Sequence, residues 1–178
     1  DYPTHLELLN EAYVNSGQPK VYDQNLIDEW RTKSKTDPTN YPNTDWFREI
    51  LKPSVISEHN LSVRGGSEKS NFLLSLGYLD NKGVVENAEY EKYSFRLNAD
   101  SKVSDWLSLG GNVFGFWSER GPLDVSYLFN TMLMTNPGIL PKSSDGRYGG
   151  SMMEGENTKA YNPRATMESA TGNNERQR

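Results

Sequence analysis

The sequence predicts a mainly β protein built on antiparallel amphipathic strands, with short helices before and after them in the chain. Three observations indicate this class. Between residues 55 and 118, apolar and polar residues alternate with a period of two, as in strands with two different faces. Short turns and long connections alternate between these strands. The flanking segments instead carry apolar residues at helical spacing, beside residues that favour helix caps.

Residues 1–54 are expected to form short amphipathic helices in an otherwise irregular segment. Thr4 opens a capping box for the first helix, and a second helix is expected to start at Asp23. Asn43 or Thr44 can cap a third, because both side chains can accept a hydrogen bond from a backbone N–H of the first turn.

Residues 55–118 are expected to form four antiparallel strands of about 10 to 13 residues. The alternation is cleanest over residues 93–100, where aromatic and aliphatic side chains alternate with polar ones. The fourth strand, residues 106–118, is less regular because Phe114 and Phe116 fall on its second face. These four strands are the predicted centre of the fold.

Residues 119–178 are expected to form one long connection with a short helix capped by Asp124. Aromatic residues of this connection are candidate substrate contacts, because sugar rings stack their C–H faces on aromatic rings. The candidates are Tyr127, Phe129, Tyr148 and Tyr161. Packing within the loop, or contact with a partner protein, explains these residues equally well.

The strands have the length and alternation of transmembrane β-strands. Short turns and long loops would then lie on opposite sides of a membrane, with residues 1–54 and 119–178 on the long-loop side. The polar face would face the lumen of a barrel and carries Arg64, Arg96, Asn98 and Asp100. A soluble sheet with one solvated face produces the same alternation. Because a transmembrane barrel needs about eight strands, four strands could only be a fragment of one.

Composition excludes several classes of function. The 178 residues include 19 Lys plus Arg against 24 Asp plus Glu, for a net charge of -5, so no basic surface for nucleic acid is expected. There is no Cys, and His5 and His59 are the only histidines. No nucleophile-elbow motif occurs, so we expect neither an enzyme nor a bound cofactor. Carboxylates of the loop at 80–91 could bind a cation, although solvated charges are the expected state, and no metal ligands are assigned.

Four segments closely resemble, in order, the SusC/RagA family of TonB-dependent transporters from the Gram-negative outer membrane. These segments are Tyr41 to Trp46 (YPNTDW), His59 to Lys69 (HNLSVRGGSEK), Ser75 to Asp80 (SLGYLD) and Tyr93 to Asp100 (YSFRLNAD). The match covers about residues 1–120. It identifies the chain as a fragment of the barrel region of such a transporter.

The resemblance implies a parent barrel of about 22 strands with a plugged lumen, set in outer-membrane lipid. It implies import of oligosaccharides or oligopeptides, with energy from the TonB complex through an N-terminal part of the parent. A SusD-like lipoprotein would lie over the external loops. The alternative is a soluble β-rich glycan-binding or adhesion module. What covers the apolar face of the strands distinguishes the two.

Overall fold

The computed structural model describes residues 1–151, 153, 162–170 and 175–177. The chain divides into two compact units. The helical unit contains residues 1–52 and 124–170, and the sheet unit contains residues 53–123 and 171–178. Each unit is described by itself.

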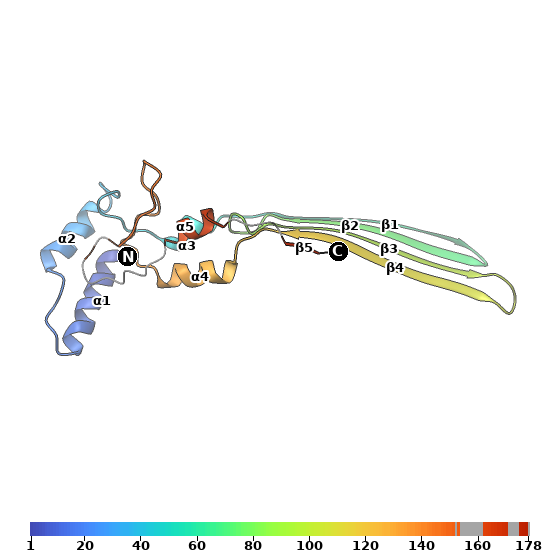
Figure 1. Ribbon diagram of the computed structural model, residues 1–178, viewed down its shortest axis with the longest axis horizontal. Helices are drawn as coiled ribbons and strands as arrows, with labels where there is room; N and C mark the ends of the chain where they lie inside the picture. The colour runs from blue at the N-terminus through green and yellow to red at the C-terminus, as the bar shows by residue number, and fades with distance from the viewer. Residues whose placement is uncertain (152, 154–161, 171–174, 178) are drawn as a thin grey trace. The chain divides into compact units, whose positions relative to one another are not determined.

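The sheet unit is a single antiparallel meander in which neighbours in sequence are neighbours in space (Figure 1). Its strands are β1 (Ile56–Ser67), β2 (Ser70–Asn81), β3 (Tyr90–Lys102), β4 (Ser108–Arg120) and the short β5 (Glu175–Gln177). The first four are 12 or 13 residues long. The predicted antiparallel strands are therefore confirmed.

The strand register sorts the side chains into two faces. Leu61 pairs with Leu76, Leu76 with Phe95, and Phe95 with Gly115. Directly opposed residues in antiparallel strands share a face, so each such set forms a row across the sheet. The apolar face has two further rows of this kind: Val63, Leu74, Leu97 and Val113, and then Gly65, Phe72, Ala99 and Gly111. Mostly polar residues occupy the opposite, polar face.

Connections alternate in length, as the sequence predicts. The β1–β2 turn is residues 68–69 and the β3–β4 turn is residues 103–107, whereas residues 82–89 join β2 to β3. Within this longer connection, Gly83 and Asn87 have φ values of 67° and 64°, a left-handed conformation that these two residue types adopt most readily.

The last connection of the sheet, residues 121–174, ends at β5, which the sequence analysis did not anticipate. Ser118, Glu119 and Arg120 pair with Gln177, Arg176 and Glu175. The final residues therefore continue the meander at one end of β4. Three residues carry too little periodicity to indicate a strand, so the hydrogen-bonding partner alone defines it.

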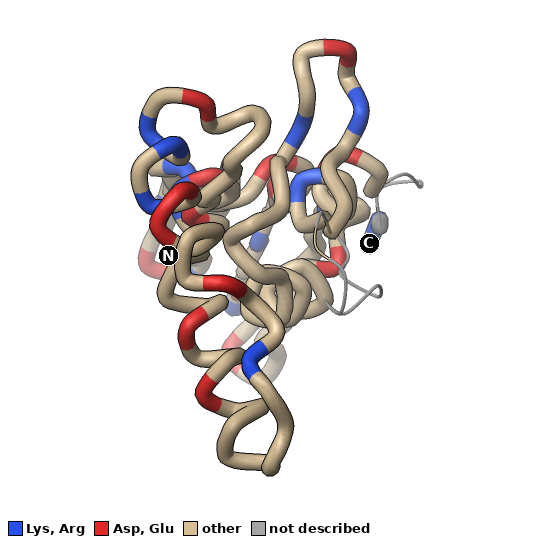
Figure 2. The backbone as a smooth tube through the Cα atoms, turned by 90° about the vertical axis from the view of Figure 1, so that its left-hand side faces the viewer, with Lys and Arg blue, Asp and Glu red and all other residues tan. Residues whose placement is uncertain are grey.

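Five helices lie in the described part of the helical unit. They are α1 (Tyr2–Asn15), α2 (Gln24–Lys33), α3 (Trp46–Ile50), α4 (Val125–Met134) and α5 (Pro163–Glu168). Acidic and basic residues are interspersed along this unit (Figure 2). Several of them form ion pairs, such as Arg31 with Glu7 at 2.7 Å and Lys33 with Glu29 at 2.5 Å. No helix among the described residues is long and apolar enough to cross a bilayer.

Two of the predicted helix caps are wrong. Asp1, not Thr4, caps α1, and its side chain accepts a hydrogen bond from the Thr4 N–H. Asp45 caps α3 in place of Asn43 or Thr44. Those two side chains instead bind distant backbone: Asn43 Oδ1 accepts from the Tyr2 N–H at 2.8 Å, and Thr44 Oγ1 donates to the Ile139 carbonyl at 2.8 Å.

The predicted start of the second helix at Asp23, which caps α2, and the predicted cap Asp124 of α4 are confirmed. The sequence analysis missed α5, which has only six residues and begins with Pro163 after the capping residue Asn162.

Aromatic packing holds α1 and α2 together. Tyr2, Leu6, Tyr22, Ile27 and Trp30 form a buried cluster. Within it, Asn10 accepts from the N–H groups of Val21 and Tyr22 and donates to the Tyr22 carbonyl, at 2.8 to 3.0 Å. The loop after α1 thus satisfies its backbone groups through one buried side chain.

Candidate functional site

The apolar face of β1–β4 is a feature of the sheet unit that internal packing does not explain. Leu61 is 62% exposed, Leu76 47% and Phe95 45%. Buried positions of a soluble sheet would instead be close to fully covered. A contiguous apolar surface of this kind marks contact with another protein or with a membrane.

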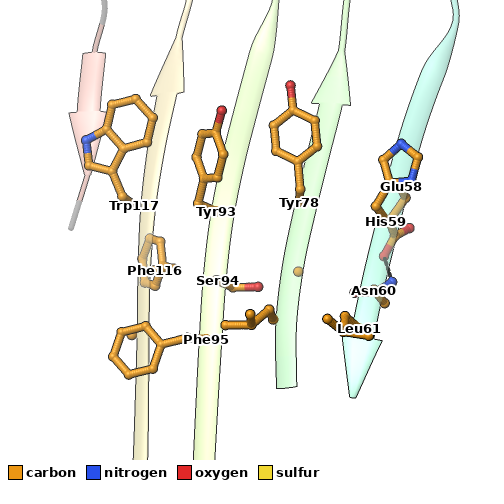
Figure 3. Close-up of a pocket in the computed structure, with 13 residues that line it drawn as sticks. Glu58, His59, Asn60, Leu61, Tyr78, Tyr93, Ser94, Phe95, Phe116 and Trp117 are labelled. Carbon is orange, nitrogen blue, oxygen red and sulfur yellow. Dashed lines mark hydrogen bonds between the residues drawn. The ribbon is translucent and has the colours of Figure 1, made fainter. Parts of the chain in front are cut away.

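An aromatic row borders this face at one end. His59, Tyr78, Tyr93 and Trp117 lie in register across the four strands (Figure 3). The ring centroids of successive members are 6.3, 4.8 and 5.5 Å apart. Tyr and Trp gather at membrane–water interfaces because they combine an apolar ring with a polar group. We call these four residues the girdle row.

Charged side chains follow directly beyond the girdle row. The next row contains Asp80, Glu91 and Glu119. Lys82 Nζ lies 3.1 Å from Asp80 Oδ1 and 3.9 Å from Glu91 Oε1. Lys82 therefore forms ion pairs with two of the carboxylates that sequence analysis considered for a cation. Among the described residues, no three His, Cys, Asp or Glu side chains are arranged to hold a metal ion.

On the apolar side of the girdle row, aromatic rings pack over glycines of neighbouring strands. The Phe95 ring covers Gly115, so closely that a Cβ there would clash with it. The Phe72 ring would similarly lie 2.8 Å from a Cβ at Gly65. A hollow lined by Leu61, Leu76, Phe95 and Gly115 of the next row and by the girdle row remains beside these contacts (Figure 3).

The polar face carries all four residues predicted to face a lumen. Arg64, Asn98 and Asp100 line one hollow with Asn71. Arg96 lies elsewhere on this face, with its guanidinium carbon 5.5 Å from the centre of the Phe114 ring. The structure thus brings three of the four together and leaves the fourth on an aromatic ring. That this face lines a lumen stays a prediction.

Sequence analysis missed the association of cations with aromatic rings on this face. Lys92 Nζ lies 5.3 Å from the centre of the Phe116 ring, parallel to the pairing of Arg96 with Phe114. The two rings are 6.1 Å apart. Only the register of β3 against β4 reveals these pairs, although the two Phe residues at alternate positions were a visible departure from the pattern.

The predicted loop aromatics do not share one location. Tyr127 and Phe129 both lie on α4, where Tyr127 is 47% exposed and Phe129 is half-buried. Tyr148 lies in the loop between α4 and α5 and donates to Glu168 Oε2 at 2.7 Å. Tyr161 lies outside the described residues. Their role in binding substrate stays a prediction.

Tyr148 belongs to a cluster of charges around Glu168. Lys142 Nζ lies 2.5 Å from Glu168 Oε2, and Arg164 Nε donates to Glu168 Oε1. Arg164 also reaches Glu49 of α3 at 3.0 Å. Hydrogen bonds from Lys142, Arg164 and Tyr148 lower the pKa of the Glu168 carboxyl from 4.5 to about 2. These contacts join α3, α5 and the loop between α4 and α5.

The chain is similar to parts of known TonB-dependent receptors. It is 36% identical over 115 residues to the TonB-dependent receptor P26 of Formosa agariphila, covering 64% of this chain and 11% of that protein. It is 32% identical over 72 residues to the TonB-dependent receptor SusC of Bacteroides thetaiotaomicron, covering 40% of this chain and 7% of that protein. No protein-family model matches the sequence. The chain matches only about a tenth or less of the length of these two relatives.

Solved structures agree on the fold. The RagAB peptide transporter matches with a TM-score of 0.59 and 19% identity over 90% of this chain and 20% of that one. A second structure, of the RagAB peptide importer in its open-open state, matches with a TM-score of 0.59 and 21% identity over 94% of this chain and 22% of that one. The predicted resemblance to the SusC/RagA type is confirmed, and the fold is that of a TonB-dependent transporter barrel fragment.

Proposed function

We propose that the chain forms part of the wall and external loops of a TonB-dependent transporter in the Gram-negative outer membrane. The observation that carries the proposal is the exposed apolar face of β1–β4, which ends at the girdle row. Lipid would cover this face, and the polar face would look into the lumen. The matched relatives are named as receptors and transporters, not as enzymes, which supports the same class.

The dimensions of the apolar face suit a bilayer. From the girdle row to the row of Ser67 and Ser70 is eight residues along a strand, or about 27 Å at 3.4 Å per residue. A tilt of about 40° reduces this length to about 21 Å of height, close to the roughly 25 Å apolar band of outer-membrane barrels. Lipid alone would therefore cover the height of these rows, without a partner protein.

The transported material would be oligosaccharides or oligopeptides. Support for peptides comes from the RagAB transporter, whose name states that substrate, and oligosaccharides are the other substrate class that the resemblance to the SusC/RagA family implies. We further propose a SusD-like surface lipoprotein over the external loops, namely residues 1–54 and 119–178. Energy would reach the transporter through a TonB complex that contacts another part of the parent protein.

Uptake by the full-length parent tests the proposal. The parent would be expressed in a Gram-negative host, and import of fluorescently labelled oligosaccharides and oligopeptides would be measured with and without TonB. We expect a heat-modifiable barrel in the outer membrane and import of one ligand class that stops without TonB. A water-soluble, monomeric product that folds without detergent would instead support a soluble glycan-binding or adhesion module.

A further inference from the structure

The polar face of β1–β3 contains three cations without a carboxylate partner. They are Arg64, Lys92 and Arg96, and none of them forms an ion pair within the described part of the chain. Carboxylates on this face belong to Glu58, which accepts from Asn60 Nδ2 at 3.0 Å, and to Asp100, whose side chain lies beside Gly110. The cations are therefore available for an anionic ligand.

Two of these cations lie on exposed aromatic rings. Phe114 is 57% exposed and Phe116 is half-buried, and Arg96 and Lys92 contact their rings from β3. A cation held over a ring is kept close to it and presents its remaining N–H donors to a ligand. Lys92, Arg96, Phe114 and Phe116 together form what we call the cation-aromatic strip.

We propose that the cation-aromatic strip binds an oligosaccharide that carries carboxylate groups, such as a chain of uronic acids. The two Phe rings offer electron-rich faces to the C–H groups of sugar rings. Arg96 and Lys92 are four residues apart on β3, or about 14 Å, and would pair with carboxylates on separate sugar units. This inference rests on the proposed function, because the strip must line the transport path.

Hydroxyl and amide side chains around the strip favour a sugar over a peptide. Asn60, Ser62, Ser75 and Ser94 lie on this face in the two cross-strand rows that end at Phe116 and Phe114, and the Ser62 and Ser75 hydroxyls are 2.9 Å apart. Such groups suit the hydroxyls of a sugar. An extended peptide gains much of its affinity by pairing its backbone with a free strand edge. The face of a hydrogen-bonded sheet presents no free backbone groups.

Calorimetry on the full-length transporter in detergent tests the proposal with two ligands of equal length. The probes are hexagalacturonate and its carboxyl-reduced, neutral counterpart. We expect hexagalacturonate to bind at least tenfold more tightly, and Arg96→Gln to weaken its binding by about tenfold without affecting the neutral ligand. Phe114→Leu should weaken both. Lys69→Gln, which removes the same charge from the β1–β2 turn, is the matched control.

Several results would overturn the proposal. Equal binding of the two sugars would remove the role of the cations, and equal effects of Arg96→Gln and Lys69→Gln would remove the specific site. Tighter binding of hexaglutamate than of hexagalacturonate would identify an acidic peptide as the ligand. A heat-modifiable barrel that binds none of these probes would refute the strip alone, whereas a product without a barrel would refute the proposed function as well.

Discussion

An arginine introduced on the apolar face should destabilise the barrel according to its depth in the membrane. Each row below the girdle row is two residues farther along the strand, or about 6.8 Å. At a tilt of about 40°, one row corresponds to about 5 Å of depth. Leu76 therefore lies about 5 Å inside the girdle row and Leu97 about 10 Å inside it. With an apolar band about 25 Å tall, Leu97 is the position near the midplane.

The substitution Leu97→Arg is thus expected to lower the free energy of unfolding by about 2 to 4 kcal/mol. Leu76→Arg should lower it by less, because Arg can extend to the interface from a shallower position. Asn98→Arg is the matched control, since Asn98 neighbours Leu97 in β3 but lies on the polar face. On the polar face, the added charge should change the free energy of unfolding only slightly.

Urea titration of the full-length protein in lipid vesicles, followed by heat-modifiable mobility, measures these differences. A sheet covered by a protein core would respond differently, because Leu76→Arg and Leu97→Arg would then cost similar amounts. Equal loss of stability at the two depths, or an equal effect of Asn98→Arg, would refute the membrane placement of this face.

Four further substitutions, two of them with matched controls, test the packing and charge contacts. Gly115→Ala should destabilise by about 1 to 3 kcal/mol in urea titrations because the new Cβ displaces the Phe95 ring, whereas Gly111→Ala, which meets nothing within 4 Å, should be close to neutral. Asn10→Ala should destabilise the helical unit by about 2 to 4 kcal/mol, since it leaves buried backbone groups of Val21 and Tyr22 unsatisfied; protease protection with the exposed Asn15→Ala as control checks this. The lowered pKa of Glu168 means that its stabilising contribution is complete above about pH 4.5 and is lost as the pH falls towards 2. Glu168→Gln should abolish that part of the acid sensitivity, and Tyr148→Phe should shift it to higher pH, as read by the urea midpoint between pH 5 and 2.5; unchanged acid sensitivity in both variants would contradict the assignment.

Alternation of residue types made the sheet predictable. In β3, each apolar residue from Tyr93 to Ala99 is separated from the next by a polar one, and a one-residue shift would reverse both faces. The register in the structure aligns the apolar residues of the four strands in rows across the sheet. Local sequence was therefore sufficient for β1 to β4 and for the face that each of their residues occupies.

Contacts between distant residues were not predictable in the same way. Asn43, Thr44 and Asp45 are three adjacent residues that can all cap a helix, and the choice of Asp45 depends on the bonds that the other two make to Tyr2 and Ile139. Sequence patterns do not report such partners.

The candidate site also has a part that the sequence predicts and a part that depends on contacts between distant residues. The four residues predicted for the polar face share it because of strand alternation alone. Their actual neighbours depend on the registers between strands. The pairing of Arg96 with Phe114, and the cluster that joins Arg164 to Glu49 across 115 residues, required the folded chain.

The accessibility of single cysteines along β3 tests the central claim most directly. The chain has no Cys, so spin labels can be placed one at a time from Tyr93 to Asp100 in full-length protein that has no other cysteine. In lipid vesicles, we predict that labels at 93, 95, 97 and 99 collide with oxygen dissolved in the bilayer, and that labels at 94, 96, 98 and 100 collide with a water-soluble nickel chelate. Odd-numbered labels that neither reagent reaches would place a protein core on the apolar face and contradict its assignment to a membrane barrel.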